Sequence, residues 1–168
     1  MLNIKIKFSK IYLILLTLFT FSTLHAENAL SVELALKNEK NGSIIITLTN
    51  TSTKDIRVLK WNTPLENRLN ANLFLVKNGK EPIAYLGRLL KRGKPTDSDY
   101  TVFGAGEKRT VVIELSKYYK MIKKGDYSVS YNGSFTLEGI VNQKSILHKA
   151  KVTNSTLNFL FTPVEKKN

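Results

Sequence analysis

The fold is decided by residues 30–50, which read LSVELALKNEKNGSIIITLTN. Apolar side chains occupy every second position in both halves of this stretch, and Asn41-Gly42 separates the halves. A period of two is typical of strands with one buried face, and Asn-Gly favours a tight turn between antiparallel strands. The stretch therefore predicts a hairpin of residues 30–36 and 44–48.

Further segments with strand character follow at short intervals. They are residues 56–61, 72–77, 81–86, 109–115, 127–131 and 156–161. Asn78-Gly79 and Asn132-Gly133 add turn signals between them. About eight short strands joined by polar turns predict an all-β protein, an immunoglobulin-like antiparallel β-sandwich with one short helical insertion.

Three segments depart from this alternation. Lysines recur at helical spacing in residues 117–124, so we expect the helical insertion there, closed by Gly125. Residues 87–99 combine cations, Gly, Pro and two Asp residues, which predicts a long exposed loop. Residues 135–151 carry the weakest pattern, and we assign no strand to them.

Two aromatic residues point to the immunoglobulin-like type of sandwich. Trp61 lies on the predicted third strand, and Tyr127 begins a late strand, where such domains place a core tryptophan and a tyrosine corner. Val129 stands where antibody domains have a cysteine. We therefore expect Trp61, Tyr127 and Val129 in the core. The alternative is another kind of sandwich, in which both aromatics are simply large half-buried side chains.

The first 26 residues predict an export signal. Residues 1–10 hold three lysines and no acid, residues 11–21 are almost wholly apolar, and Ala26 is a small residue at a cleavage position. We expect a signal peptide over residues 1–26 and the sandwich domain over residues 27–168. The protein is then periplasmic or extracellular and touches the membrane only before cleavage. A retained anchor is the alternative.

Removal of the signal would leave 23 Lys and Arg against 13 acids. Such a charge attracts acidic protein faces, anionic lipid or other polyanions, and nucleic acid is the least accessible of these to an exported chain. Without cysteine, the domain must be stabilised by packing alone.

Residues able to carry catalysis or hold a metal are scarce. The absence of cysteine excludes a thiol nucleophile and a cysteine zinc site, and His148 is the one histidine after residue 26. The chain contains neither His-Glu-x-x-His nor Gly-x-Ser-x-Gly. Asp97 and Asp99 follow four cations in sequence. This favours two carboxylates that balance those charges over an acid and base pair or a cation site. We expect no enzyme, no metal and no cofactor. A hydrolase that depends on Asp97 or His148 is the alternative.

A binding surface is what remains. Residues 85–100 combine aromatic side chains with Arg and Lys, types that are enriched at protein interfaces. We predict Arg88, Lys91 and Arg92 as charge partners of an acidic protein surface. Tyr85 and Tyr100 are predicted as its aromatic anchors.

Three stretches carry a resemblance to a known family. They are VLKWNTPLE (58–66), YLGRLLKRGKPT (85–96, with Asp99-Tyr100 following) and GDYSV (125–129). They resemble the non-catalytic amino-terminal domain that precedes the zinc domain in bacterial deuterolysin-like, peptidyl-Lys type metalloendopeptidases. The resemblance covers about residues 29 to 131.

The resemblance implies a pro-domain or accessory role. In that family a zinc domain with a His-Glu-x-x-His helix follows, and the expected work of the amino-terminal domain is to hold a metalloprotease domain inactive or help it fold. We therefore expect a secreted, non-catalytic protein-binding module. The alternative is a structural or adhesive envelope module whose basic face binds anionic lipid or polysaccharide.

Overall fold

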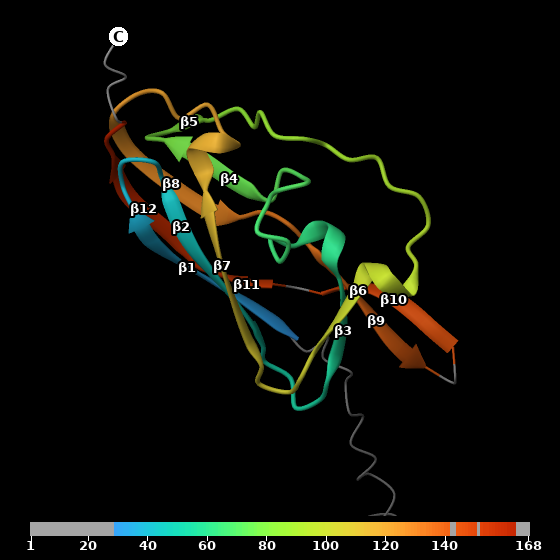
Figure 1. Cartoon of the computed structure of the whole chain (residues 1–168). Coiled ribbons are helices and arrows are strands. Elements are labelled where there is room, and N and C mark those ends of the chain that lie inside the picture. The colour runs from blue at the N-terminus through green and yellow to red at the C-terminus, as the bar shows by residue number, and fades with distance from the viewer. Residues whose placement is uncertain (1–28, 142–143, 151, 164–168) are drawn as a thin grey trace, which may run out of the picture.

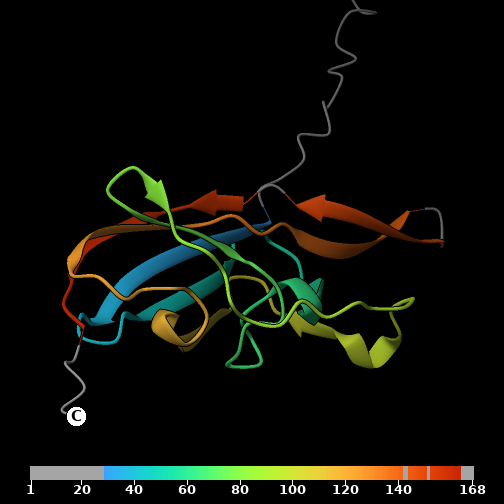
Figure 2. The ribbon, with the colours of Figure 1, turned by 90° about the horizontal axis from the view of Figure 1, so that it is seen from above.

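The computed structural model describes residues 29–141, 144–150 and 152–163. Two sheets face each other across a core, and a third sheet extends from one end of them (Figures 1 and 2). The all-β antiparallel sandwich is therefore confirmed. The predicted signal peptide lies outside the described residues, as does the side chain of His148.

The first sheet has the order β11-β1-β2-β7 and the second the order β12-β8-β4-β5. The strands of the first are β1 (Leu30–Asn38), β2 (Ser43–Asn50), β7 (Lys108–Glu114) and β11 (Val152–Asn154). Those of the second are β4 (Phe74–Asn78), β5 (Glu81–Pro82), β8 (Gly125–Tyr131) and β12 (Thr156–Phe161). The orders β1-β2-β7 and β12-β8-β4 match strands A-B-E and G-F-C of an immunoglobulin-like sandwich.

The third sheet has the order β10-β9-β3-β6. Its strands are β3 (Ile56–Leu59), β6 (Tyr100–Phe103), β9 (Phe135–Val141) and β10 (Lys144–Ala150). The fully buried Asn50 at the end of β2 joins it to the first sheet, because its amide donates to the carbonyls of Phe103 and Gly104 at 3.1 and 2.8 Å.

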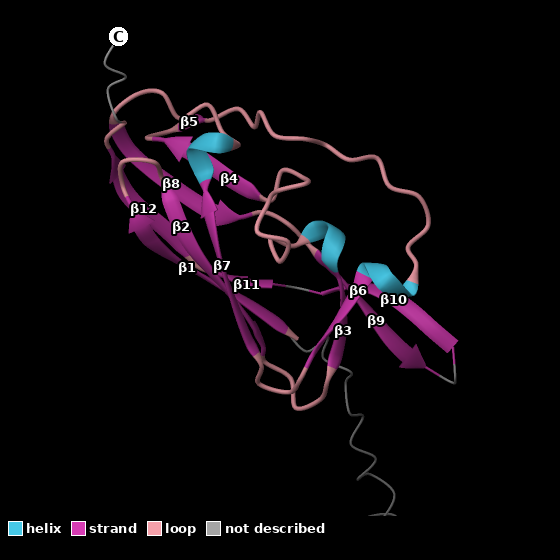
Figure 3. Ribbon diagram, in the orientation of Figure 1, coloured by secondary structure: helices cyan, strands magenta, loops and turns pink. Residues whose placement is uncertain are grey.

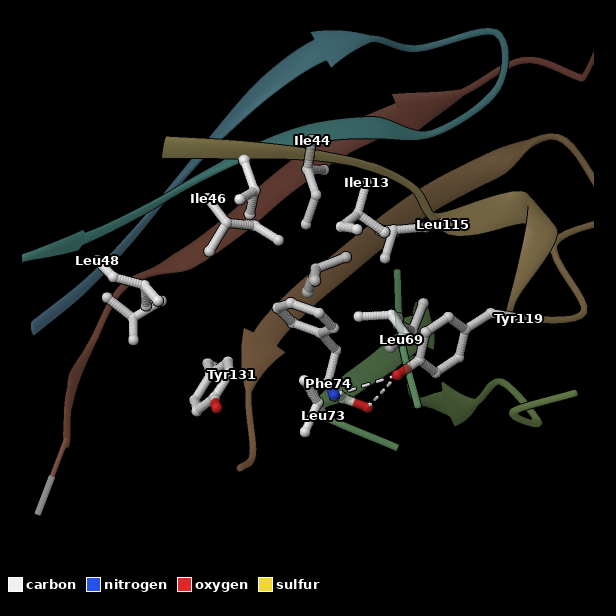
Figure 4. Close-up of a cluster of buried hydrophobic side chains, with 14 of the residues drawn as sticks. Ile44, Ile46, Leu48, Leu69, Leu73, Phe74, Ile113, Leu115, Tyr119 and Tyr131 are labelled. Atoms are coloured by element: carbon white, nitrogen blue, oxygen red, sulfur yellow. Dashed lines mark hydrogen bonds between the residues drawn. The ribbon is translucent and has the colours of Figure 1, made fainter. Parts of the chain in front are cut away.

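The core lies between the first two sheets and holds no described polar side-chain atom that is buried without a partner (Figure 4). Ile44 and Ile113 face it from the first sheet, and Phe74 packs edge-on against Tyr131 with ring centroids 5.5 Å apart. The Tyr119 hydroxyl accepts from the amide of Phe74 at 3.1 Å, and burial raises the pKa of that hydroxyl. Buried polar atoms are thus paired as well as packed.

Tyr127 and Val129 are buried on β8, with exposed fractions of 2% and 0%. The Tyr127 hydroxyl donates to the carbonyl of Lys123 at 3.0 Å, four residues upstream. This is the contact that defines a tyrosine corner. It supports the immunoglobulin-like assignment independently of the strand order.

The placement of Trp61 differs from the prediction. β3 ends at Leu59, and the chain enters a 3₁₀ turn, η1 (Lys60–Asn62), which Thr63 closes with its amide and hydroxyl on the Lys60 carbonyl at 3.1 and 2.8 Å. Trp61 is therefore half-buried and outside the core cluster. β4 takes the place of the core strand, with Phe74 and Val76 buried.

The helical insertion is shorter than predicted and lies earlier. A 3₁₀ turn, η3, spans Leu115–Lys117, and the helical conformation ends there. Tyr119 then forms a single β-bridge with Tyr85, and the Lys120 amide donates to the Ala84 carbonyl at 2.9 Å. Tyr119 and Met121 are both buried, a spacing of two that suits extended backbone and overrides the lysine spacing. Strands β6, β9, β10 and β11 were not predicted. The strand predicted over residues 81–86 is shorter, because β5 spans only Glu81–Pro82.

Candidate interaction surface

Residues 86–96, here called the strap, run along the outside of the molecule without helix or strand and lead into a 3₁₀ turn, η2 (Asp97–Asp99) (Figures 1 and 3). Three of its leucines are exposed, namely Leu86 by 65%, Leu89 by 74% and Leu90 by 45%. Four exposed cations lie among them, namely Arg88, Lys91, Arg92 and Lys94. The strap therefore presents apolar and cationic groups together.

Tyr85 holds the start of the strap. Its ring packs against Tyr119 with centroids 5.2 Å apart, and its hydroxyl lies within hydrogen-bond distance of the carbonyls of Leu69 and Arg88, at 3.3 and 3.1 Å. Burial raises the pKa of Tyr85. A Cβ at Gly87 would come within 2.4 Å of the Tyr85 hydroxyl, so a larger residue there would displace that hydroxyl from its two carbonyl partners. Tyr85 thus packs on its own chain, and its role as an aromatic anchor for a partner stays a prediction.

Asp99 holds the end of the strap. Its carboxylate accepts from the Thr96 amide at 2.9 Å, from the Thr96 hydroxyl at 2.7 Å and from the Trp61 indole N–H at 2.8 Å. These hydrogen bonds, the one from the Thr96 amide foremost, lower the pKa of Asp99 to about 2. Trp61 is half-buried here because its indole N–H finds an acceptor at the molecular edge.

The middle of the strap lies on the loop of residues 60–72. The Leu90 amide donates to the Asn70 carbonyl at 3.3 Å, and the Arg92 guanidinium stands over the Trp61 ring, 5.3 Å from its centroid. Asn70 is in turn fixed by donating to Glu66 at 2.7 Å. Two sequence stretches that carry the family resemblance, residues 58–66 and 85–96, therefore meet in space.

Tyr100 directly follows Asp99 in the chain but packs against a different partner, Arg57. It lies on β6, half-buried, with the Arg57 guanidinium 4.7 Å above its ring centroid. Burial raises the pKa of Tyr100. Arg57 also bonds Asp97 at 2.8 Å and pairs with Glu138. Tyr100 thus packs within the third sheet, and its role as an aromatic anchor for a partner stays a prediction.

Arg88, Lys91 and Arg92 are exposed on the strap beside one another. Sequence reasoning missed the exposed leucines, Leu86, Leu89 and Leu90. For Leu89 and Leu90 the signal that could have found them is their position inside a run of cations and breakers, where no strand or helix can turn them inward.

Within residues 29–141, 144–150 and 152–163, no group of His, Asp or Glu side chains could hold a metal ion. Asp97 forms an ion pair with Arg57, and the Asp99 carboxylate accepts hydrogen bonds from Thr96 and Trp61. No helix among those residues is long and apolar enough to cross a bilayer.

About half of the chain is similar to a curated extracellular protease. It is 43% identical over 86 residues, 51% of its length, to the "Extracellular protease" of Aeromonas hydrophila. It is 29% identical over 113 residues, 64% of its length, to the "Neutral protease 2 homolog" of Phaeosphaeria nodorum. The chain spans only 24% and 31% of these two proteins, and no protein-family model matches it. It is therefore similar to a protease-associated region.

Proposed function

We propose that this chain is an exported, non-catalytic accessory module that binds a metalloprotease domain of the deuterolysin-like type through the strap. The observation that carries the proposal is the strap itself, which is fixed at both ends and displays Leu86, Leu89 and Leu90 to solvent. Such exposure on a soluble surface is typical of a binding site. The similarity to proteins named as proteases supplies the class of partner.

Two kinds of side chain on the strap would do different work. The leucines would bury apolar area in the partner and govern how long the complex lasts. Arg88, Lys91 and Arg92 would speed the encounter with an acidic protease surface, an effect that salt weakens. Because Tyr85 and Asp99 hold the strap already extended, little conformational entropy would be lost on binding.

The test uses the chain from Glu27 and a separately expressed deuterolysin-like zinc catalytic domain. We expect a complex in surface plasmon resonance and slower peptide hydrolysis by that domain as the chain is added. Leu86→Ser combined with Leu89→Ser and Leu90→Ser should weaken binding by about 100-fold, mainly through faster dissociation. The thermal stability of this variant should stay close to that of the unmodified chain, because the three side chains lie outside the core.

A second set of variants separates the effect of charge on the association rate from the contribution of apolar packing. Arg88→Glu combined with Lys91→Glu and Arg92→Glu should lower the association rate about tenfold at low salt, with a smaller difference at high salt. Lys54→Glu combined with Lys108→Glu, two exposed lysines away from the strap, serves as the control and is compared with Lys91→Glu combined with Arg92→Glu, which reverses the same number of charges. The absence of a complex, or equal affinity of the leucine variant and the unmodified chain, would refute the proposal.

A further inference from the structure

A second surface lies where the turn after β4 meets residues 119–124. An open hollow of about 460 Å³ there is lined by Asn78, Glu81, Ile83, Lys120, Ile122, Lys123 and Tyr127. The Lys120 amide donates to the Ala84 carbonyl and the Gly79 amide to the Asp126 carbonyl, both at 2.9 Å. These bonds hold two segments together that are about forty residues apart in sequence, and Figure 1 shows them side by side at the β5 end of the molecule.

Four exposed lysines lie on this hollow or next to it in sequence, since Lys120 and Lys123 line it, Lys80 precedes Glu81 and Lys124 follows Lys123. They are Lys80, Lys120, Lys123 and Lys124, here called the lysine patch together with Ile83 and Ile122. None of the four forms an ion pair within the part of the chain that the structure describes. The acids nearest to these lysines are Glu81, which lines the hollow, and Asp126, two residues after Lys124 in sequence. Cations therefore outnumber acids at this surface.

An apolar side chain projects from the middle of these charges. Ile122 is 64% exposed, although its sequence neighbours Met121 and Tyr119 are buried at 5% and 1%. Ile83 is half-buried on the same lining. Because Met121 would lie 3.0 Å from a Cβ at Gly42, the segment is anchored on the first hairpin and Ile122 is turned outward.

We propose that the lysine patch docks on an anionic lipid bilayer. A bilayer surface offers negative headgroups beside an apolar layer, which are the partners that the four lysines and Ile122 each need. A soluble polysaccharide would satisfy the lysines alone and gain nothing from Ile122. This function is independent of the strap, because none of the strap residues contributes to it.

The expected strength of membrane binding follows from the number of lysines and from Ile122. Each lysine near an anionic surface strengthens membrane partition by about fivefold, and this part falls as salt screens it. Burial of one isoleucine adds a contribution that salt does not weaken. Binding should therefore be moderate, strongly dependent on anionic lipid and only partly reversed by salt.

The test is cosedimentation of the chain from Glu27 with vesicles. That chain contains every described strand and lacks the apolar residues 11–21, which would bind lipid by themselves. We expect binding to vesicles of phosphatidylcholine and phosphatidylglycerol in equal parts, and none to phosphatidylcholine alone. Lys120→Gln combined with Lys123→Gln should weaken partition about 20-fold.

Two further variants isolate the site. Lys54→Gln combined with Lys108→Gln removes the same charge near the end of β2 that lies away from Gly42, and should change partition by less than about threefold. Ile122→Ser should weaken the binding that persists at high salt. The proposal is overturned if the chain does not bind anionic vesicles, or if the two lysine pairs have equal effects. It is also overturned if Ile122→Ser binds like the unmodified chain while dextran sulfate competes fully.

Discussion

The sandwich core and the strap are built in opposite ways. In the core, every large side chain from β2, β4, β7 and β8 that faces inward is buried, and regular backbone pairing sets its position. In the strap, three leucines are exposed, and a few side chains at its two ends set its course. The comparison teaches that order and burial are separate properties, since a segment can be held in place while its apolar groups stay available to a partner.

The largest loss of stability is expected from a cavity in the core. Phe74→Ala removes a ring that is 1% exposed and packs on Tyr131, so the free energy of unfolding should fall by about 3–5 kcal/mol. Urea unfolding followed by circular dichroism measures this loss. If the strap were as important to stability as the core, its triple leucine variant would show a comparable fall.

Leu75 gives the matched control on the same strand. It is the next residue of β4 but faces outward and is 39% exposed, so Leu75→Ala should cost less than about 1 kcal/mol. Equal losses for Phe74→Ala and Leu75→Ala would contradict the assignment of the two faces of β4.

The next effect concerns the tyrosine corner, which joins a core ring to a surface segment. Tyr127→Phe keeps the ring but removes the hydroxyl that donates to the Lys123 carbonyl at 3.0 Å, so we expect a loss of about 1 kcal/mol in the free energy of unfolding. The residue also lies beside the lysine patch, and lipid binding should be little changed. The measurement is again urea unfolding.

Tyr118→Phe is the control for that variant, because the Tyr118 hydroxyl makes no hydrogen bond within the part of the chain that the structure describes and its ring is half-buried. Its unfolding free energy should change by less than about 0.5 kcal/mol. A loss as large as that of Tyr127→Phe would show that the ring environment, and not the corner bond, carries the effect.

The core was predictable because its signals are local in sequence. Period-two alternation located β1, β2, β7, β8 and β12. Asn41-Gly42 located the turn between β1 and β2 and Asn78-Gly79 the turn between β4 and β5, where the glycines adopt φ of 63° and 58°. β6 and β9 were missed because their strand character depends on pairing with β3, a contact that no local pattern encodes.

The candidate site was only half predictable for the same reason. Composition alone located the cations Arg88, Lys91 and Arg92 in an exposed loop. It could not tell that Tyr85 bonds the Leu69 carbonyl or that Trp61 bonds Asp99, since these contacts join segments 16 and 38 residues apart. Aromatic type indicates interface and core equally well, and only the fold decides between them.

The smallest effect on global stability, and the sharpest test of how the strap is held, is its response to acid. The pKa of Asp99 lies at about 2 against an ordinary value of 3.8, so the carboxylate form stabilises the contacts to Thr96 and Trp61. Because the folded pKa is the lower one, this stabilisation is complete above about pH 4 and is lost as the pH falls through about 2. Trp61 is the one tryptophan of the chain, so its fluorescence reports this contact directly.

We expect a change in Trp61 emission with a midpoint near pH 2, while far-ultraviolet circular dichroism of the sheets stays constant through the same step. Asp99→Asn should show the altered emission already at neutral pH and no such transition, because its amide cannot ionise. Tyr85 makes the opposite end of the strap independent of acid, since its hydroxyl is neutral throughout this range. A midpoint near 3.8, or an unaltered profile in Asp99→Asn, would mean that the strap is held without the charged carboxylate, and the contrast with the core would then rest on exposure alone.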